Sequence, residues 1–341
     1  MTYRMIILCC ALFASLVGGF LCSFIFNKPA ISAPFGEGHH NVIWFQESDD
    51  ETPKQILKRT SSFQLDKDAV INSIMKECPD QQIKVALYDL DEQKYLIKPE
   101  HDDKIQSASL IKLLILAYSM EQKQQNPNKF NEDLQLTSNE YVKGSGILQY
   151  IPANVGEKFT LNNLDYLMIT KSDNIAANIL IKQLGMSNIN HFADQLRLSG
   201  NTHLYNLLML PQNKFLSCSD TDAHCNSTSV EDMVKLLRFL SRYPEAMLFL
   251  EHQEDRSGIP ATFDKLNTAI VHNKTGTLTQ LRSDAAIIDY NQHRYVLVIA
   301  VKNADKKQGD KIIQEISSTV LKTFIDPSIT ATKLEKNKKP A

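Results

Sequence analysis

The stretch Ser109-Leu-Ile-Lys-Leu-Leu-Ile-Leu-Ala117 combines a serine, a lysine three residues later and a run of apolar side chains. The apolar residues recur at helical spacing, which predicts a buried helix beginning at Ser109. Backbone N–H groups at a helix N-terminus favour negative charge that develops on a nearby serine, and Lys112 lies one turn along on the same face. The stretch fits a nucleophile with its amine base; a serine that only caps the helix is the alternative.

Two further short motifs follow along the chain, Ser172-Asp-Asn174 and Lys274-Thr-Gly-Thr277. Each is weak evidence alone, since Ser, Asp and Asn also cap helices and a second S-x-x-K, Ser73-Ile-Met-Lys76, fits a plain amphipathic helix. Gly276 weakens the predicted strand unless something approaches its backbone closely, as a substrate lying along the strand edge would. In this order the motifs supply a nucleophile, an amine base, a second hydroxyl and a cationic strand, which indicates an acyl-transferring serine enzyme.

The rest of the sequence predicts strands at both ends of a domain and helices between them. The expected elements are a helix at 66–78, strands at 83–90 and 94–97, helices from 109 and at about 161–171, 175–184 and 229–241, strands at 269–277, 284–290 and 294–302, and a last helix at 310–324. This order predicts an α/β (α+β) fold, in which distant segments complete one antiparallel five-stranded sheet flanked by helices. An all-helical subdomain is inserted between the halves of the sheet, and the site is expected in the crevice between the two layers.

Composition excludes several other classes of function. The 341 residues are 43% hydrophobic and 22% charged, enough for one core of ordinary globular size. A formal net charge of -2 gives no electrostatic case for a nucleic-acid partner. The histidines show no HExxH-like spacing, so we expect neither a metal nor another cofactor. Oligomeric state is not addressed by any of these patterns.

The N-terminal segment 1–27 is predicted to be a transmembrane anchor or signal. Residues 5–26 contain no charge, and a helix of that length rises roughly 33 Å, enough to span a hydrocarbon core. Secretory signals normally have a shorter apolar region, which favours an uncleaved anchor with the domain outside the cytoplasm, in the periplasm or at the cell surface. Cleavage after Ala30-Ile-Ser32 is the alternative and would give a secreted protein.

The remaining boundaries follow from composition. Residues 28–65 form a polar linker, 66–328 the globular domain, and 329–341 a basic, disordered tail. Outside the apolar segment the cysteines are Cys78, Cys218 and Cys225. The last two are close enough in sequence to join one loop, and two thiols are equally consistent with the spacing.

Over residues 66–326 the chain resembles the class A β-lactamase and penicillin-binding serine hydrolase family. The resemblance rests on the three motifs in order, on Gly144-Ser-Gly-Ile-Leu-Gln149, on residues 226–233 and on Gly258-Ile-Pro260 ahead of the Lys-Thr-Gly motif. It implies a β-lactamase/transpeptidase-like fold and a substrate that is a small-molecule β-lactam or a D-Ala-D-Ala peptide.

The resemblance also implies a role for each catalytic candidate. Ser109 attacks a carbonyl after losing its proton to Lys112, whose ammonium form is disfavoured by burial and by Lys274. The amides of Ser109 and Thr277 form the oxyanion hole. Ser172 passes the proton to the leaving nitrogen.

Other matched residues are implied to bind the substrate. Asn174 holds the substrate amide, and Thr275 with Lys274 grips its carboxylate. Arg282 either adds charge to that grip or is a solvated strand residue, whereas Asp173 fits a structural cap better than a participant. The expected substrate-binding set is therefore Asn174, Thr275, Gly276, Thr277 and Arg282.

One departure from the family concerns release of the acyl group. Class A β-lactamases carry a loop Glu-x-x-Leu-Asn whose carboxylate activates the deacylating water, yet residues 207–229 contain no glutamate. Asp220 and Asp222 fit solvated loop positions better than this role. We therefore expect acylation to be easier than release.

Three functions from different classes remain open at this stage. The first is a β-lactamase-like hydrolase, which turns over β-lactams slowly. The second is a D-alanyl-D-alanine-type carboxypeptidase acting on peptidoglycan, which needs no loop glutamate. The third is a non-catalytic β-lactam or cell-wall binding protein, against which the intact nucleophile and lysines speak.

Overall fold

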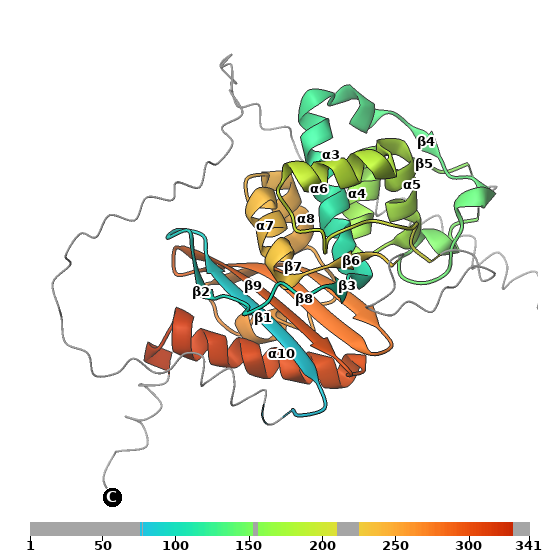
Figure 1. The fold of residues 1–341 in the computed structure, drawn as a ribbon. Coiled ribbons are helices and arrows are strands. Elements are labelled where there is room, and N and C mark those ends of the chain that lie inside the picture. The colour runs from blue at the N-terminus through green and yellow to red at the C-terminus, as the bar shows by residue number, and fades with distance from the viewer. Residues whose placement is uncertain (1–75, 77, 153–155, 210–224, 330–341) are drawn as a thin grey trace, which may run out of the picture. The chain divides into compact units, whose positions relative to one another are not determined.

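The computed structural model describes residues 76, 78–152, 156–209 and 225–329 (Figure 1). The apolar segment 5–26, the linker at 28–65, nearly all of the predicted helix at 66–78 and residues 330–341 lie outside these residues. Among the residues that are described, no helix is both long and apolar enough to cross a membrane. Cys225 takes part in a disulfide whose partner lies outside the described ranges.

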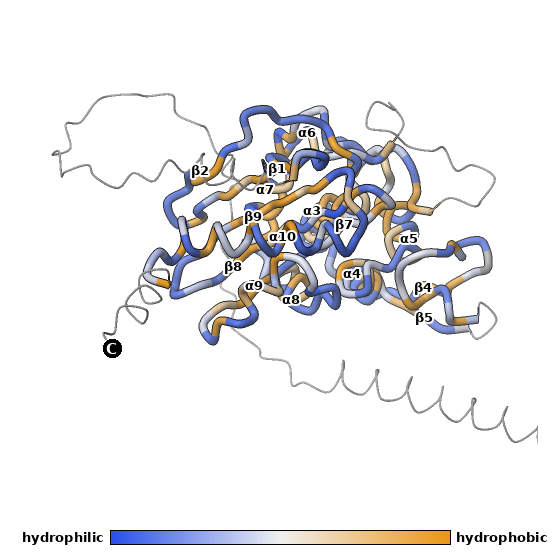
Figure 2. The backbone as a smooth tube through the Cα atoms, turned by 90° about the horizontal axis from the view of Figure 1, so that it is seen from below, coloured by the Kyte–Doolittle hydropathy of each residue, from blue (hydrophilic) through white to orange (hydrophobic). Residues whose placement is uncertain are grey.

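The predicted antiparallel sheet is confirmed. Its strand order is β2-β1-β9-β8-β7, and every neighbouring pair is antiparallel. The strands are β1 Gln82–Asp89, β2 Lys94–Ile97, β7 Ala269–Leu278, β8 Leu281–Tyr290 and β9 His293–Lys302. The first strand therefore lies beside the last one, and β7, which carries the Lys-Thr-Gly motif, is an edge strand. Figure 2 shows apolar residues running along the central strands β1 and β9.

Strand β8 begins three residues earlier than the sequence pattern predicts. Arg282 and Ser283 precede the predicted strand at 284–290, but both belong to β8, and together with Asp284 they are fully buried in the sheet. A strand covered on both faces needs partners for such groups, and a neighbouring loop and helix α10 (Lys306–Val320) supply them.

Helices cover both faces of the sheet (Figure 1). One face packs against α10 and α9 through a cluster that includes Val85, Ile299, Phe263 and Ile313. The other face packs against the helical layer through Ala86, Leu237 and Val298. The helices are α3 Lys112–Gln125, α4 Leu161–Thr170, α5 Asn174–Leu184, α6 Met186–Gln195, α7 Val230–Leu240, α8 Pro244–Glu251, α9 Pro260–Phe263 and α10 Lys306–Val320.

Two short strand pairs complete the fold. β3 Ile105–Gln106 pairs with β6 Ser227–Thr228, and β4 Leu134–Gln135 pairs with β5 Lys158–Phe159. The first pair fixes the chain just before Ser109, because the amide of Ser107 also donates to the carbonyl of Asn226 at 3.0 Å.

The helical layer contains a buried acid, Asp165 of α4. Its Oδ2 accepts a hydrogen bond of 2.5 Å from Ser119 Oγ of α3, and its Oδ1 has no partner within the described part of the chain. Burial raises the pKa of this carboxyl from 3.8 to about 8. The neutral acid is therefore the form that the core accommodates at neutral pH.

We expect Asp165→Asn to stabilise the domain by a margin that grows with pH. Between about pH 4 and pH 8 the folded chain keeps a proton on Asp165 that the unfolded chain has released, so wild-type stability falls through this window. Asparagine does not titrate. Thermal unfolding should show a difference in melting temperature that widens from pH 5 to pH 8 and is constant above. A difference independent of pH would contradict the assignment, and the surface variant Asp133→Asn serves as control.

Candidate active site

Ser109 lies in a tight 3₁₀ turn, not in the first turn of an α-helix as its sequence predicts. The turn spans Ala108–Ile111, and α3 begins only at Lys112. Ala108 has a φ of 45°, in the left-handed region that residues with a Cβ seldom adopt. The tight turn leads directly from strand β3, which is fixed by its pairing with β6, into α3. The predicted relation to Lys112 holds, since Lys112 Nζ lies 3.2 Å from Ser109 Oγ.

Lys112 is fully buried and surrounded by acceptors. Its Nζ donates to the carbonyl of Ser172 at 2.6 Å and to Asn174 Oδ1 at 2.8 Å, and it lies 3.2 Å from Ser172 Oγ. Burial, together with the charge of Lys274, lowers the pKa of this amine well below its ordinary value. A neutral amine has a lone pair, so Lys112 can accept a proton from Ser109 Oγ.

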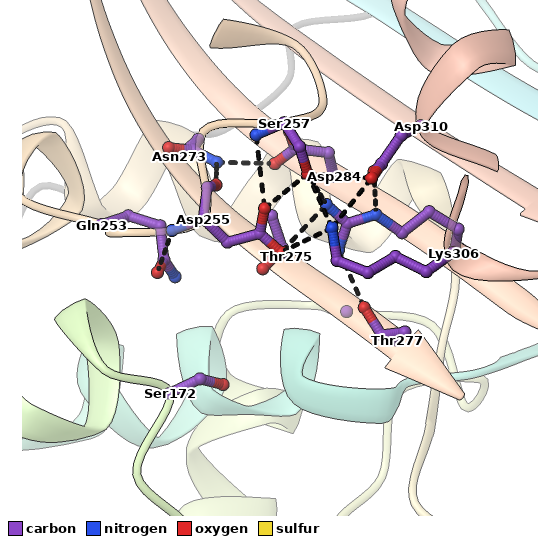
Figure 3. Close-up of polar contacts among 12 residues, drawn as sticks. Ser172, Gln253, Asp255, Ser257, Asn273, Thr275, Thr277, Asp284, Lys306 and Asp310 are labelled. Carbon is purple, nitrogen blue, oxygen red and sulfur yellow. Dashed lines mark hydrogen bonds and ion pairs between the residues drawn. The ribbon is translucent and has the colours of Figure 1, made fainter. Parts of the chain in front are cut away.

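Ser172 connects the two lysines. Its Oγ lies 3.2 Å from Lys112 Nζ and accepts a hydrogen bond of 3.1 Å from Lys274 Nζ. Its backbone is also in the left-handed region, with a φ of 51°. Such a conformation costs about 1–3 kcal/mol at a residue with a Cβ and persists only where the surroundings enforce it. Figure 3 shows Ser172 on the helical layer, across from the strand that carries Thr275 and Thr277.

Asp173 caps helix α5, as its interpretation as a structural cap predicts. It is the N-cap of α5, and its Oδ1 accepts hydrogen bonds from the amides of Ile175 and Ala176. Its Oδ2 accepts a bond of 2.8 Å from the amide of Leu148. The carboxylate therefore ties the start of α5 to the loop that carries the Gly-Ser-Gly-Ile-Leu-Gln motif.

Both glycines of that loop are required by close contacts. Gly146 has a φ of 111°, and a Cβ there would lie 2.2 Å from the Asp173 carboxyl. Gly144 has a φ of 124°, and a Cβ would lie 2.7 Å from Nδ2 of Asn174. In addition, the amide of Asn174 donates to the carbonyl of Ser145 at 3.1 Å. The loop thus sets the position of Asn174. Because residue 144 is a glycine, no side chain from the loop covers the side-chain nitrogen Nδ2 of Asn174.

We expect Gly146→Ala to destabilise the domain by about 1–3 kcal/mol, because the new Cβ meets the Asp173 carboxyl in a backbone conformation that alanine disfavours. Thermal unfolding measures the loss. Gly200→Ala is the matched control, since no atom lies within 4 Å of a Cβ at that position. Equal melting temperatures for the two variants would show that the loop yields without cost.

Lys274 extends from the edge strand β7 toward Ser172. The side chain is fully buried, and its Nζ donates to the carbonyl of Thr275 at 2.8 Å as well as to Ser172 Oγ. Burial lowers the pKa of Lys274 to about 7, although the nearby carboxylates of Asp284 and Asp255 act to raise it. This amine therefore changes its charge close to neutral pH.

Contacts within the protein itself already require a glycine at position 276, and the close approach of a substrate to this strand stays a prediction. A Cβ at Gly276 would lie 2.5 Å from Ser283 Oγ, 3.2 Å from the Leu110 side chain and 3.3 Å from Ala108. The missing side chain lets β7 pack directly against the turn that carries Ser109. The same contact brings Thr277, which is exposed, beside that turn.

Arg282 of β8 is not a solvated strand residue, and that alternative is wrong. Its side chain is fully buried. It forms ion pairs with Asp255 at 3.1 Å and Asp310 at 2.5 Å, and it donates to Thr277 Oγ1 at 2.8 Å. Three of the other expected residues contact the buried amine of Lys112, and Lys274 reaches the same place through Ser172 Oγ; the three are Ser109, Ser172 and Asn174.

Sequence reasoning missed the polar network behind β7. Asp284 is fully buried and accepts hydrogen bonds from Asn273 Nδ2 at 3.0 Å and from the amide of Ile259 at 2.9 Å. Burial raises its pKa to about 6. Gly258 precedes Ile259, and a Cβ there would lie 2.3 Å from the Asp284 carboxylate. The signal that could have indicated this network is the polar run Arg282-Ser-Asp284 next to an apolar strand segment.

A buried lysine between two serines, and a second lysine reaching it from an edge strand, define a serine hydrolase with a mixed sheet-and-helix fold. A family model described as "Beta-lactamase enzyme family" matches residues 67–324, and the chain belongs to this family. No curated protein matches the sequence.

Solved structures agree on the fold. A β-lactamase from Sphaerobacter thermophilus is 19% identical, with a TM-score of 0.66 over 81% of this chain and 100% of that one. A class A β-lactamase from Mycobacterium abscessus is 20% identical, with a TM-score of 0.64 over 76% of this chain and 98% of that one. PBP-A, as a leucine-to-glutamate variant in an acyl-enzyme complex with penicillin G, is 22% identical, with a TM-score of 0.64 over 76% and 95%.

Proposed function

We propose that this serine hydrolase forms an acyl-enzyme on Ser109 with β-lactams or related amides and releases the product slowly. The observation that carries the proposal is the position of Lys112 Nζ, buried 3.2 Å from Ser109 Oγ and 3.2 Å from Ser172 Oγ. A neutral amine at that place serves both the attacking hydroxyl and the hydroxyl that faces the leaving group. Burial and Lys274 supply the lowered pKa that this role requires.

The proposed reaction uses the site in two steps. Ser109 Oγ bonds to the substrate carbonyl carbon while its proton passes to Lys112 Nζ, and the amides of Ser109 and Thr277 stabilise the oxyanion. The C–N bond then breaks, and the nitrogen takes a proton through Ser172 Oγ, which contacts both lysines. Water must later cleave the ester to release the acyl group. Since residues 207–229 contain no glutamate to activate that water, release is the slow step.

Substrate binding is proposed for residues around this pair of serines. Asn174 would hold the substrate amide, since its Oδ1 is engaged by Lys112 while Nδ2 faces Gly144. Thr275 and Lys274 would bind the carboxylate. The acyl-enzyme of the related PBP-A with penicillin G supports this substrate class.

A D-alanyl-D-alanine-type carboxypeptidase is the second candidate, favoured by the missing glutamate, because lysine alone then serves as the base. A non-catalytic binding protein is the third, and the low pKa of Lys112 argues against it.

Export with anchoring through residues 5–26 is also proposed. The Cys225 disulfide supports it, since disulfides persist mainly outside the reducing cytosol.

The deciding experiment follows a penicillin adduct over time. The full chain, purified in mild detergent, is mixed with penicillin G, and intact-protein mass spectrometry records the covalent mass and its decay. Appearance of the adduct supports acylation. Decay over minutes with hydrolysed penicillin identifies a slow β-lactamase, an adduct stable for hours identifies the carboxypeptidase type, and no adduct at any concentration overturns the proposal.

We expect the preference for an anionic substrate to fall as pH rises through about 7. Lys274 is charged below its pKa of about 7 and neutral above it, so its attraction for a carboxylate is lost on that side. The measurement is the ratio of second-order acylation constants for penicillin G and its methyl ester between pH 5.5 and 8.5. Taking the ratio cancels the titration of Lys112, which acts on both compounds. A ratio that does not change with pH would remove Lys274 from carboxylate binding.

A further inference from the structure

Helix α4 ends just ahead of the Ser-Asp-Asn motif, and its last turn is bound by a loop from elsewhere in the chain. The last carbonyls of a helix have no donor within the helix. Here Gln253 Nε2 donates to the carbonyl of Ile169 at 2.9 Å, and the amide of Glu254 donates to the carbonyl of Thr170 at 3.1 Å. Both donors belong to the 253–259 loop, which lies between α8 and α9. This loop therefore fixes the place where α4 ends.

The same loop is bound to the sheet next to the second lysine of the site. The carbonyl of Asp255 accepts a hydrogen bond of 3.3 Å from Asn273 Nδ2, and Asn273 directly precedes Lys274 in β7. Further along the loop, the amide of Ile259 donates to the carboxylate of Asp284 in β8 at 2.9 Å. One short segment is thus attached both to the backbone before the second serine and to the strand that carries the lysine.

Gln253 is the side chain that joins these two attachments. It is only 3% exposed. While its Nε2 donates to α4, its Oε1 accepts a hydrogen bond of 3.3 Å from the amide of Asp255. Figure 3 shows the hydrogen bonds that join Gln253, Asp255 and Asn273 in a row. The surface ion pair of Glu254 with Lys171 also crosses to α4, but exposed pairs of this kind contribute little.

The contact that this arrangement serves is the one between Ser172 and Lys274. Ser172 follows α4 in the helical layer, and Lys274 extends from the sheet, so their hydrogen bond of 3.1 Å joins the two layers. A bond of this kind weakens steeply when its atoms move apart. The placement of the end of α4 against β7 therefore decides whether Ser172 Oγ stays within reach of the lysine amine.

We propose that Gln253 is a positioning residue: by holding the end of α4 against the loop that binds Asn273, it keeps Ser172 within hydrogen-bond reach of Lys274. This inference rests on the proposed function, in which Ser172 passes the proton to the leaving nitrogen. Gln253 acts only through the placement of Ser172. It should therefore affect the chemical step of acylation and not the first binding of the substrate.

Saturation kinetics of labelling with penicillin G test this split. The dependence of the labelling rate on penicillin concentration gives a maximal acylation rate and an apparent dissociation constant for the first complex. Gln253→Leu keeps a side chain of similar length and removes both hydrogen bonds. We expect it to lower the maximal rate roughly 10- to 100-fold, because displacing a reacting group by about 1 Å has effects of that size. The apparent dissociation constant should stay within about twofold of wild type.

A double-mutant cycle tests whether the effect passes through Ser172. Ser172→Ala removes the hydroxyl that Gln253 is proposed to place, and its slow acylation is followed by intact-protein mass spectrometry over hours. In this background Gln253→Leu should lower the maximal rate by no more than about twofold, since two residues that act through one contact are not additive. General damage to the site would lower the rate by the same factor in both backgrounds.

The conservative variant Gln253→Glu adds a test with pH. Glutamate keeps the acceptor for the amide of Asp255, but it can donate to the carbonyl of Ile169 only as the protonated acid. Burial favours that neutral form. We expect the maximal rate relative to wild type to be near one at pH 5 and to fall toward the value of Gln253→Leu by pH 8. This variant also keeps the inference testable if Gln253→Leu does not fold.

Asn188→Leu is the matched control. Asn188 Nδ2 donates to the carbonyl of Leu184 at 2.9 Å, at the end of α5 remote from Asn174. Its replacement removes the same type of bond from another helix end and should leave both kinetic constants unchanged. Circular dichroism and melting temperature are recorded for each variant.

The outcomes are distinct. A wild-type maximal rate for Gln253→Leu overturns the inference, as does a loss confined to the apparent dissociation constant. An equal loss in the Ser172→Ala background, or a ratio for Gln253→Glu that does not change with pH, also overturns it. Failure of the wild-type protein to form any adduct would instead overturn the proposed function.

Discussion

Replacing Ser109 by alanine is expected to abolish the penicillin adduct completely. Ser109 Oγ is the hydroxyl that lies beside Lys112 Nζ at the turn packed against β7, and no methyl group can form the ester. The measurement is intact-protein mass spectrometry after incubation with excess penicillin G. We expect full labelling of wild type and none of Ser109→Ala.

The matched control is Ser73→Ala, which removes the serine of the other S-x-x-K in the chain. It should label at the wild-type rate. Persistent labelling of Ser109→Ala, with loss in Ser73→Ala, would show that the wrong serine has been assigned. Because Ser109 is small and sits at a strained turn, the alanine variant should also keep the wild-type melting temperature to within a few degrees.

Replacing Lys112 is expected to slow acylation by roughly 10²–10⁴-fold, the usual contribution of a general base. Lys112→Ala removes the amine altogether. Lys112→Arg keeps a positive charge that does not dissociate near neutral pH, so it should be slow as well. Stopped-flow or quenched-flow labelling with penicillin G gives the acylation rate. For each variant, the loss of rate relative to wild type should be no larger at low pH than at high pH.

Lys123→Ala provides the control on the same helix. Lys123 lies on α3 and pairs with Glu245 at the surface, so its removal should leave the acylation rate unchanged. A near-normal rate for Lys112→Arg would mean that charge, and not proton transfer, is what Lys112 supplies. In that case the base would have to be sought elsewhere around Ser172.

The sheet could be predicted from sequence because its strands are apolar and bounded by short turns. The hairpin β1–β2 and the strands β7 and β9 lie within a residue or so of their predicted positions. Helices α6, α8 and α9 were missed. Two of them begin with a proline, which reads as a break although it is well tolerated in the first turn. Helix α10 begins four residues early because Asp305 caps it.

The site could be predicted as a set of residues but not as a geometry. The motifs placed Ser109, Lys112, Ser172 and Lys274 in one crevice, and the structure brings their side chains together. The left-handed backbone of Ser172 has no sequence signature, and it lies next to Asp173 and Asn174, which the Gly144–Gln149 loop binds in the folded chain. The burial of Arg282 also depends on tertiary structure, because its two carboxylates come from a loop and from α10.

The antiparallel pairing of β1 with β9 has a consequence for how this protein is made. The two strands are separated by some two hundred positions of sequence, yet they are immediate neighbours at the centre of the sheet. During synthesis β1 must therefore wait, unpaired, until nearly the whole chain has emerged, and such non-local pairing is slow. A ribosome that stalls before β9 would leave an unfinished polypeptide whose hairpin has no partner, and that product should be a substrate for chaperones and proteases.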